Sequence, residues 1–505
     1  MPEQAYQRGL MWLRNDLRIA DNTALYRAGK ACNAVAAIYI ACPQTWASHG
    51  DGDRVVAMRL RSLRQLQVAL AKKHIPLFFL ELAEFTDVPA ALAQIVEKLQ
   101  VGALFANAEY PVNELHRDQA VRRRLKQLGV PVEYATDRTL IPPGSLTTGS
   151  GGGFKVFTPF KRAFIARHDN SGDAFAPLPS LRTRHPDCAE VWPEWIAVAG
   201  SNNLVRTIPE TVGDYGVAPG GHNRVLDWPV GEAAGTRALK AFAELVDDYD
   251  RWRDFPAQKN TSRLSPYLNC GAVSVRQCVA MAVAENGGRW AGPSEGATTW
   301  LSELLWREFY QHLVVNFPRV CRNKPFKPET ENVPWSNREE DFERWCEGKT
   351  GVPIVDAAMR QLNQTGWMHN RLRMVVASFL TKNLLTDWRK GERYFMQQLV
   401  DADFAANNGG WQWAASTGTD AAPYFRVFNP YSQSRRFDPE GAFIRRYLPE
   451  LASLPSKEIH CPAVQPASGQ SPSGDLFSPV DYPAPICDVT DSRKRAIEVF
   501  ASLKS

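Results

Sequence analysis

The chain has 505 residues, and its 59 lysines and arginines outnumber its 54 aspartates and glutamates by five. Apolar residues make up 44% and charged residues 22%, which is close to the globular average and excludes a disordered chain. The near balance of charge also excludes a polybasic nucleic-acid-binding tail. The length allows two or three domains. One excess stands out, because eight of the fifteen tryptophans lie between Trp300 and Trp413.

The chain shows no sequence signal for export or membrane insertion. Residues 1–8 are polar with no apolar leader after them, and the longest apolar runs end well before about eighteen residues. The nine cysteines are scattered and form no Cys-x-x-Cys pair, which favours free thiols over disulfides or a zinc site. We therefore expect a cytoplasmic protein with no membrane segment and no metal.

Residues 1–140 alternate short apolar runs with amphipathic segments. The apolar runs predict strands at 10–13, 35–40, 77–80, 103–106 and 130–134, and the amphipathic segments predict helices at 54–73, 88–99 and 112–127. This order predicts an α/β domain with a doubly wound, five-stranded parallel sheet. No Gly-x-Gly-x-x-Gly follows the first strand, so we expect no dinucleotide at that turn.

The remaining chain divides into a linker, a helical domain and a tail. Residues 141–227 are predicted to be an interdomain linker, because prolines and glycines at 142–144 and 149–153 break the pattern. Within this linker, residues 181–223 are rich in proline, glycine and asparagine and lack clear periodicity. Helical periodicity dominates residues 228–450, with helices predicted at 232–249, 274–285, 298–316, 352–364, 368–385 and 391–399. Residues 451–505 form a proline-rich tail that ends in a short helix at 491–503.

The segment 300–310 places several chemically useful side chains on one side of a helix. Trp300, Glu303 and Arg307 share a face that Trp306 borders, while leucines and Phe309 supply a core on the other side. The alternative is a plain helix with two buried tryptophans and a Glu–Arg pair. On this segment alone the two interpretations are equally good.

The next helix carries Asn370 and Met374 as i,i+4 neighbours. An amide beside a soft thioether suits a flat base with hydrogen-bonding edges. An ordinary amphipathic helix start explains this segment better when it is taken alone.

A third segment, 401–413, sets two acids and two amides in an apolar context. Asp401 and Asp403 need partners because buried carboxylates are costly, and Arg373 is a candidate. Together with Asn407 they could satisfy the edge of a ring cofactor, and the two glycines at 409–410 allow close approach to the backbone. Helix capping by the acids is the less favoured alternative.

Two further patterns indicate contacts with phosphate groups. Residues 261–265 offer three hydroxyls and a cation at a helix start, which suits phosphate, although a simple N-cap explains them too. Basic residues alternate with aromatic ones at 251–253, 306–307, 367–373 and 424–426, a pattern typical of nucleic-acid surfaces with stacking positions.

Three long motifs now identify a resemblance. Residues 300–310 (WLSELLWREFY), 366–374 (GWMHNRLRM) and 407–420 (NNGGWQWAASTGTD) resemble the photolyase and cryptochrome family, most closely its bacterial class I cyclobutane pyrimidine dimer branch. The resemblance extends from 12–18 (WLRNDLR) to about residue 449. It implies an all-α FAD-binding domain and a lyase that repairs UV-damaged DNA in light. Excited FADH⁻ would donate an electron to a flipped-out pyrimidine dimer, the ring would split, and the electron would return.

The resemblance also implies roles for individual residues. The substrate pocket would comprise Glu303, Trp306, Asn370, Met374 and Trp413, and an electron relay would comprise Trp335, Trp388 and Trp411. FAD would be held by Tyr249, Thr261, Ser262, Arg263, Leu264, Ser265, Arg307, Arg373, Asp401, Asp403 and Asn407. DNA phosphates would be contacted by Arg253, Arg371 and Arg426. We expect a monomer that needs no protein partner.

The alternative function is that of a cryptochrome-type blue-light receptor. Receptors in the family often replace the residue at Asn407 and carry long C-terminal extensions, so Asn407 and the short tail favour repair. Asn370 stands where (6-4) photolyases carry histidine, and Trp413 stands where DASH cryptochromes typically carry tyrosine.

The resemblance further implies an antenna chromophore. His49, Asn113 and Glu114 match the positions of relatives that bind 5,10-methenyltetrahydrofolate, but Arg322 replaces a lysine of those relatives. Arginine keeps the charge and changes the contact geometry. Methenyltetrahydrofolate is the favoured antenna, with a deazaflavin or no antenna as alternatives.

Overall fold

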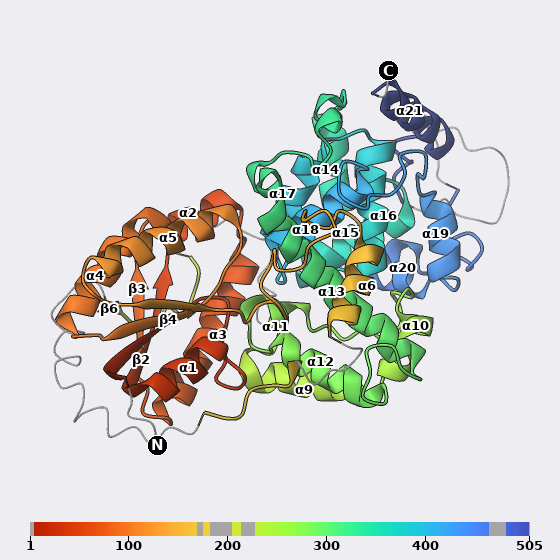
Figure 1. The fold of residues 1–505 in the computed structure, drawn as a ribbon. Helices are drawn as coiled ribbons and strands as arrows, with labels where there is room; N and C mark the ends of the chain where they lie inside the picture. Colours follow the sequence, from red (N-terminus) through yellow and green to blue (C-terminus); the bar gives the residue numbers. More distant parts are fainter. Residues whose placement is uncertain (1–4, 169–174, 182–204, 214–227, 464–480, 504–505) are drawn as a thin grey trace, which may run out of the picture.

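A mixed sheet organises the N-terminal domain of the computed structural model, which describes residues 5–168, 175–181, 205–213, 228–463 and 481–503 (Figure 1). The five predicted strands are confirmed, and they pair in parallel in the order β5-β4-β1-β2-β3. Their bounds are β1 Tyr6–Leu13, β2 Cys32–Ala41, β3 Leu77–Glu81, β4 Ala103–Asn107 and β5 Val132–Ala135. A sixth strand, β6 (Val205–Arg206), pairs antiparallel with β3 and is too short for periodicity to reveal.

Both faces of this sheet are buried, which explains the continuous apolar runs of its strands. Alternate residues of β1 enter different cores: Met11 and Leu13 point into one, and Leu10 and Trp12 into the other. The covering helices are α1 (Thr23–Ala31), α2 (Pro43–His49), α3 (Asp53–Ala71), α4 (Val88–Lys98) and α5 (Val112–Lys126). The doubly wound prediction is therefore confirmed, with the short α1 and α2 added.

The second domain is helical, as predicted. Its principal helices are α9 (Gly231–Ala243), α10 (Tyr249–Trp252), α11 (Ser265–Cys270), α12 (Val275–Glu285), α13 (Glu295–Asn316), α14 (Glu339–Glu347), α15 (Pro353–Thr365), α16 (Asn370–Ser378), α17 (Trp388–Gln398), α18 (Phe404–Ala414), α19 (Pro430–Phe437) and α20 (Ala442–Tyr447). Two predicted helices are interrupted. The first stops at Ala243 before the short α10, and the one predicted at 368–385 becomes α16 followed by a π-helical turn, η7 (Phe379–Asn383).

The segment predicted as a linker contains a helix that belongs to the helical domain. Helix α6 (Phe157–Arg167) packs against α13, and its Phe157, Phe160 and Phe164 are buried (Figure 1). Their spacing of three and four residues is a helical signal that the neighbouring glycines obscured. Most of the aperiodic stretch 181–223 lies outside the described residues.

The tail ends in helix α21 (Val489–Ser502), close to its predicted bounds. It docks on η7, where Asn383 Nδ2 donates to Ser492 Oγ at 2.8 Å and Arg495 donates to the Asn383 carbonyl at 3.0 Å. None of the described helices is both long and apolar enough to cross a membrane. Within the same residues, no set of three His, Cys, Asp or Glu side chains is arranged to hold a metal ion.

Candidate cofactor and substrate site

A cavity of about 500 Å³ in the helical domain collects the residues predicted from the motifs. Its walls come from α10, the 261–265 loop, α11, α13, α16 and α18. Every residue predicted to hold FAD lines it, as does every residue predicted for the substrate pocket. The fold thus brings separate segments of the sequence to one place.

Two ion pairs fix the acids of this cavity. Arg373 Nη2 lies 2.8 Å from Asp401 Oδ2, so the partner predicted for Asp401 is confirmed. Asp403 pairs instead with Arg138, which comes from the chain just after β5. Burial alone would raise the pKa of Asp403, but the charges of Arg138 and Arg307 outweigh it and hold that pKa below its ordinary value.

Asp403 also caps helix α18. Helix capping, which the sequence made the less favoured alternative for these acids, is therefore present. Its side chain accepts a hydrogen bond from the Ala406 amide at 2.9 Å. One carboxylate therefore caps the helix, pairs with Arg138 and lines the cavity. Capping and site formation are compatible because a carboxylate has several acceptor positions.

Asn407 is oriented by a neighbour that the sequence did not suggest. Its Nδ2 donates to the backbone carbonyl of Glu392 at 2.9 Å, which leaves Oδ1 for the cavity. The Glu392 side chain is itself buried and accepts from Asn408 Nδ2 at 3.1 Å. Burial raises the pKa of Glu392 to about 7.

The two glycines of α18 leave space for different neighbours, α13 at Gly409 and the cavity at Gly410. A Cβ at Gly409 would lie 2.2 Å from the Tyr310 ring, so glycine allows α13 to pack there. A Cβ at Gly410 would meet nothing within 4 Å, and Gly410 lines the cavity. Glycine at 410 keeps that part of the cavity open.

The two tryptophans of the predicted substrate pocket have aromatic support. Trp306 stacks on Phe157 of α6 with ring centroids 3.7 Å apart and planes 11° apart. Trp413 makes a looser contact with Phe428, at 6.5 Å. Both tryptophans are partly exposed and line the cavity, so each can present a ring to a ligand.

Glu303 lies in the same pocket and pairs with an arginine. Arg253 Nη1 is 2.8 Å from Glu303 Oε1, and neither side chain is fully buried. Arg371, which does not line the cavity, pairs with Asp254 at 2.8 Å. Arg426 is exposed. Of the three cations predicted for DNA phosphates, two are thus held by carboxylates within the protein.

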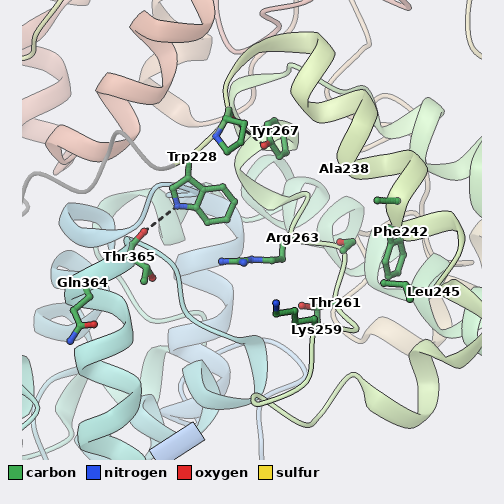
Figure 2. Close-up of a pocket in the computed structure, with 13 residues that line it drawn as sticks. Trp228, Ala238, Phe242, Leu245, Lys259, Thr261, Arg263, Tyr267, Gln364 and Thr365 are labelled. Carbon is green, nitrogen blue, oxygen red and sulfur yellow. Dashed lines mark hydrogen bonds between the residues drawn. The ribbon is translucent and has the colours of Figure 1, made fainter. Parts of the chain in front are cut away.

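A second cavity of about 500 Å³ shares residues 261–263 with the first (Figure 2). Here the Arg263 guanidinium lies between two indole rings, 4.9 Å from the Trp228 centroid and 4.8 Å from that of Trp367. Trp228 is fixed by an Nε1 hydrogen bond to the Thr365 carbonyl at 3.1 Å (Figure 2). Arg263 therefore borders both cavities. The residues 261–263 do not cap α11, whose N-cap is Leu264.

The three relay tryptophans lie on adjoining segments. Trp411 lines the cavity, Trp388 at the start of α17 is buried, and Trp335 is partly buried. The segments of Trp335 and Trp388 are joined by two hydrogen bonds, Ser336 N to the Leu385 carbonyl at 2.7 Å and Asp387 N to Asn337 Oδ1 at 2.9 Å. This arrangement is compatible with a path leading outward from the cavity.

The residues predicted for an antenna lie at the domain boundary. His49, Asn113 and Glu114 line a cavity of about 380 Å³ that also contacts α13, α17 and Asp403. Asn113 and the His49 ring are 2.8 Å apart, and Glu114 Oε2 is buried with no hydrogen-bond partner among the described residues. Burial raises the pKa of Glu114. Arg322 is exposed and does not line this cavity, whereas Cys321 does.

Three residues of the site escaped the sequence analysis: Arg138, Phe157 and Glu392. Each acts through a contact with a residue distant in the sequence, so no local spacing reveals it. The helical spacing of the phenylalanines in α6 is the one signal that could have drawn attention to Phe157.

Comparison with known proteins covers nearly the whole chain. Residues 9–182 match the family model "DNA photolyase" and residues 300–502 match "FAD binding domain of DNA photolyase". The deoxyribodipyrimidine photo-lyase of Vibrio cholerae is 45% identical over 98% of this chain and 99% of its own length. That of Escherichia coli K12 is 43% identical, over 98% of each. The crystal structure of a bacterial class III photolyase from Agrobacterium tumefaciens superposes with a TM-score of 0.80 at 32% identity, covering 99% of this chain and 98% of that one.

Proposed function

Because this chain belongs to the photolyase and cryptochrome family, we propose that it is a deoxyribodipyrimidine photo-lyase, which repairs cyclobutane pyrimidine dimers in UV-damaged DNA under blue light. One observation carries the proposal. The residues for a cofactor and those for a flipped base line one cavity of about 500 Å³, a volume in the usual range of ligand sites. The cofactor and the damaged base would therefore be in contact.

The residues of the cavity fit FAD by their chemistry. The 261–265 loop supplies hydroxyls and the Arg263 cation for a pyrophosphate, and Gly410 keeps space open beside the Asn407 amide. Bound there, reduced FAD would supply the photoexcited electron that opens the dimer ring. Asp401 and Asp403, which their arginine partners keep in place, would accept hydrogen bonds from the flavin ring.

The chain's own residues would orient the damaged base. Trp306, supported by Phe157, and Trp413 present rings on which a flipped dimer can stack. Asn370 and Met374 border the same opening from α16. Glu303, which pairs with Arg253, would accept a hydrogen bond from a pyrimidine ring N–H.

The remaining roles follow from position. DNA phosphates would be contacted by Arg253, Arg371 and Arg426. For this, Arg253 and Arg371 would give up part of their present pairing with Glu303 and Asp254. Trp411, Trp388 and Trp335 would relay electrons inward to reduce the resting cofactor. We expect a cytoplasmic monomer that needs no protein partner.

We propose methenyltetrahydrofolate for the cavity at the domain boundary. The buried Glu114 Oε2 has no hydrogen-bond partner in the described part of the chain and can accept from a pterin amine, while His49 and Asn113 offer further polar contacts. The departure at Arg322 matters less, because that side chain does not line the cavity. A near-ultraviolet absorption band in addition to the flavin bands supports a folate, and its absence after reconstitution with the folate contradicts it.

The decisive experiment for repair uses the purified, flavin-loaded and fully reduced protein. UV-irradiated DNA is mixed with it and exposed to blue light, and the dimers that persist are counted against a dark control. We expect dimers to disappear in the light only. Persistence of the dimers, with binding to DNA intact, would favour the receptor function instead.

A further inference from the structure

The loop that would bind the cofactor phosphates makes few hydrogen bonds of its own. Among the described residues, the only hydrogen bond of residues 261–263 is the one that the Leu264 amide donates to Ser262 Oγ, at a long 3.4 Å. Arg263 also adopts a φ of 51°, a left-handed conformation that is unfavourable for a residue other than glycine. Contacts from the surrounding structure must therefore keep the loop in this shape.

The side chain of Arg263 makes those contacts. Its guanidinium lies over two indole rings, 4.9 Å from the centroid of Trp228 and 4.8 Å from that of Trp367. Figure 2 shows the guanidinium beside the Trp228 ring. Arg263 forms no hydrogen bond or ion pair with any residue in the described part of the chain. The two rings, which we call the indole pair, are therefore the main anchor of the loop.

The indole pair has one common support, Thr365 at the end of α15. Trp228 Nε1 donates to the Thr365 carbonyl at 3.1 Å, and the Trp367 amide donates to Thr365 Oγ1 at 3.2 Å. In addition, the Tyr267 hydroxyl of α11 donates to the Pro229 carbonyl at 3.0 Å, which holds the chain next to Trp228. Contacts within the protein thus fix both rings in front of the loop.

A cation that aromatic rings hold in place stays available to an anion. The indole faces attract the guanidinium but take none of its N–H donors, which lie at the edge of the guanidinium plane. Two other arginines of the cavity are neutralised by acids: Arg253 pairs with Glu303. Arg373 pairs with Asp401. Arg263 is exposed to both cavities and has no acid partner among the described residues, so its donors can take the oxygens of a phosphate.

We propose that Trp228 is a positioning residue for the cofactor and that it favours flavins that carry a pyrophosphate. Together with Trp367 it holds the Arg263 guanidinium, and through it the loop 261–265, in the conformation that binds the phosphate groups. Its contribution depends on those phosphates, so a flavin without them gains nothing from Trp228. The inference rests on the FAD site proposed above.

Titrations of the full-length, flavin-depleted protein with FAD and with riboflavin test the proposal, and quenching of flavin fluorescence reports binding. Riboflavin has the ring and the ribityl chain of FAD but no phosphate. Trp228→Leu removes one of the two cation–π contacts of Arg263, so we expect affinity for FAD to fall roughly tenfold and affinity for riboflavin to change by less than about twofold. Trp228→Phe keeps an aromatic face and should bind FAD to within about threefold of the parent.

A double-mutant cycle shows whether Trp228 acts through Arg263. Arg263→Met should weaken FAD binding at least about tenfold, and adding Trp228→Leu to it should cause little further loss, because the indole then has no cation to hold. As a control, Arg122→Met removes an exposed arginine of the N-terminal domain that lies 5.0 Å from the Tyr134 ring centroid, and this variant should bind FAD as the parent does.

Three results would contradict the inference or the site on which it rests. Losses of FAD affinity that add in the double variant would overturn the inference, because Trp228 and Arg263 would then act independently. An equal fall in affinity for FAD and riboflavin in Trp228→Leu would overturn it too, since such a fall indicates lost packing. If Trp228→Leu does not fold, an equal fall for both flavins in Arg263→Met, whose replaced side chain is exposed, overturns it. A parent protein that binds neither flavin would instead refute the proposed cofactor site.

Discussion

Two polar regions inside the helical domain treat charge in opposite ways. At the cofactor cavity both acids have a counter-charge: Arg373 is 2.8 Å from Asp401, and Arg138 pairs with Asp403. Under α21 the buried Lys382 has no acid partner among the described residues, and its Nζ lies 3.4 Å from the centroid of the Phe500 ring. A paired charge keeps its protonation state and position over a wide pH range, whereas a lone buried amine titrates near neutrality. The ion pairs fix the side chains of the cavity, whereas burial lowers the pKa of the lone Lys382 to about 7.

The largest expected effect comes from breaking a pair at the cavity. Arg373→Met leaves the Asp401 carboxylate buried and uncompensated, so we expect the free energy of unfolding to fall by about 4 kcal/mol and FAD to be lost. Urea unfolding measures the first effect and the flavin absorbance of purified protein the second. As a control, Arg360→Met breaks the more exposed pair with Glu450 and should cost less than about 1 kcal/mol. If both variants lost the same free energy of unfolding, burial would not determine how much an ion pair contributes to stability.

The effect of burial on an acid beside the cavity can be examined at Glu392. Its pKa is raised from 4.5 to about 7, so the protonated form stabilises the fold fully below pH 4.5 and this contribution is lost as pH rises through 7. Glu392→Gln mimics the protonated form. We expect it to raise the free energy of unfolding at pH 8 by up to about 3 kcal/mol, with little change at pH 4.5. A parallel shift at both pH values in urea titrations would refute the assignment.

At the mouth of the cavity the expected effect is on binding. Trp306→Ala removes one stacking surface, so affinity for dimer-containing DNA should fall by about 2 kcal/mol, roughly thirtyfold, while FAD is retained. Fluorescence anisotropy with damaged and undamaged duplexes measures the change, and the undamaged duplex is the control. Loss of FAD would show that Trp306 serves the cofactor rather than the base.

The smallest expected effect comes from destabilising α21, the helix whose Phe500 lies against Lys382. Asp488 caps α21 by accepting from the Thr490 and Asp491 amides, both at 2.8 Å. Asp488→Ala should destabilise that helix by about 1 kcal/mol and raise hydrogen exchange at 489–502, with the cavity unaffected. Unchanged exchange in α21 would show that docking on η7, not the cap, holds it.

The sequence predicted a helix or strand correctly where its hydrophobic pattern follows directly from its burial. The five strands of the parallel sheet were found because both of their faces are buried, which makes each run apolar throughout. The partner of Asp401 was also predicted, since Arg373 lies on the preceding motif. The helix α6 was missed because glycine-rich neighbours outweighed the spacing of its phenylalanines. The break of the 368–385 helix was missed because a π turn leaves no mark on periodicity.

By itself the sequence determined the fold class, the family and the set of side chains that meet at the cavity, because these depend on periodicity and on long motifs. The tertiary structure alone decided which charges are paired. Arg138 pairs with Asp403, which lies 265 positions away in the sequence. Phe157 stacks on Trp306, although the segment that contains Phe157 was predicted to be a linker. It also decided that Lys382 is buried beside Phe500, an environment that no local pattern encodes. Burial and partner, which set the charge of an ionisable group, are properties of the packed chain.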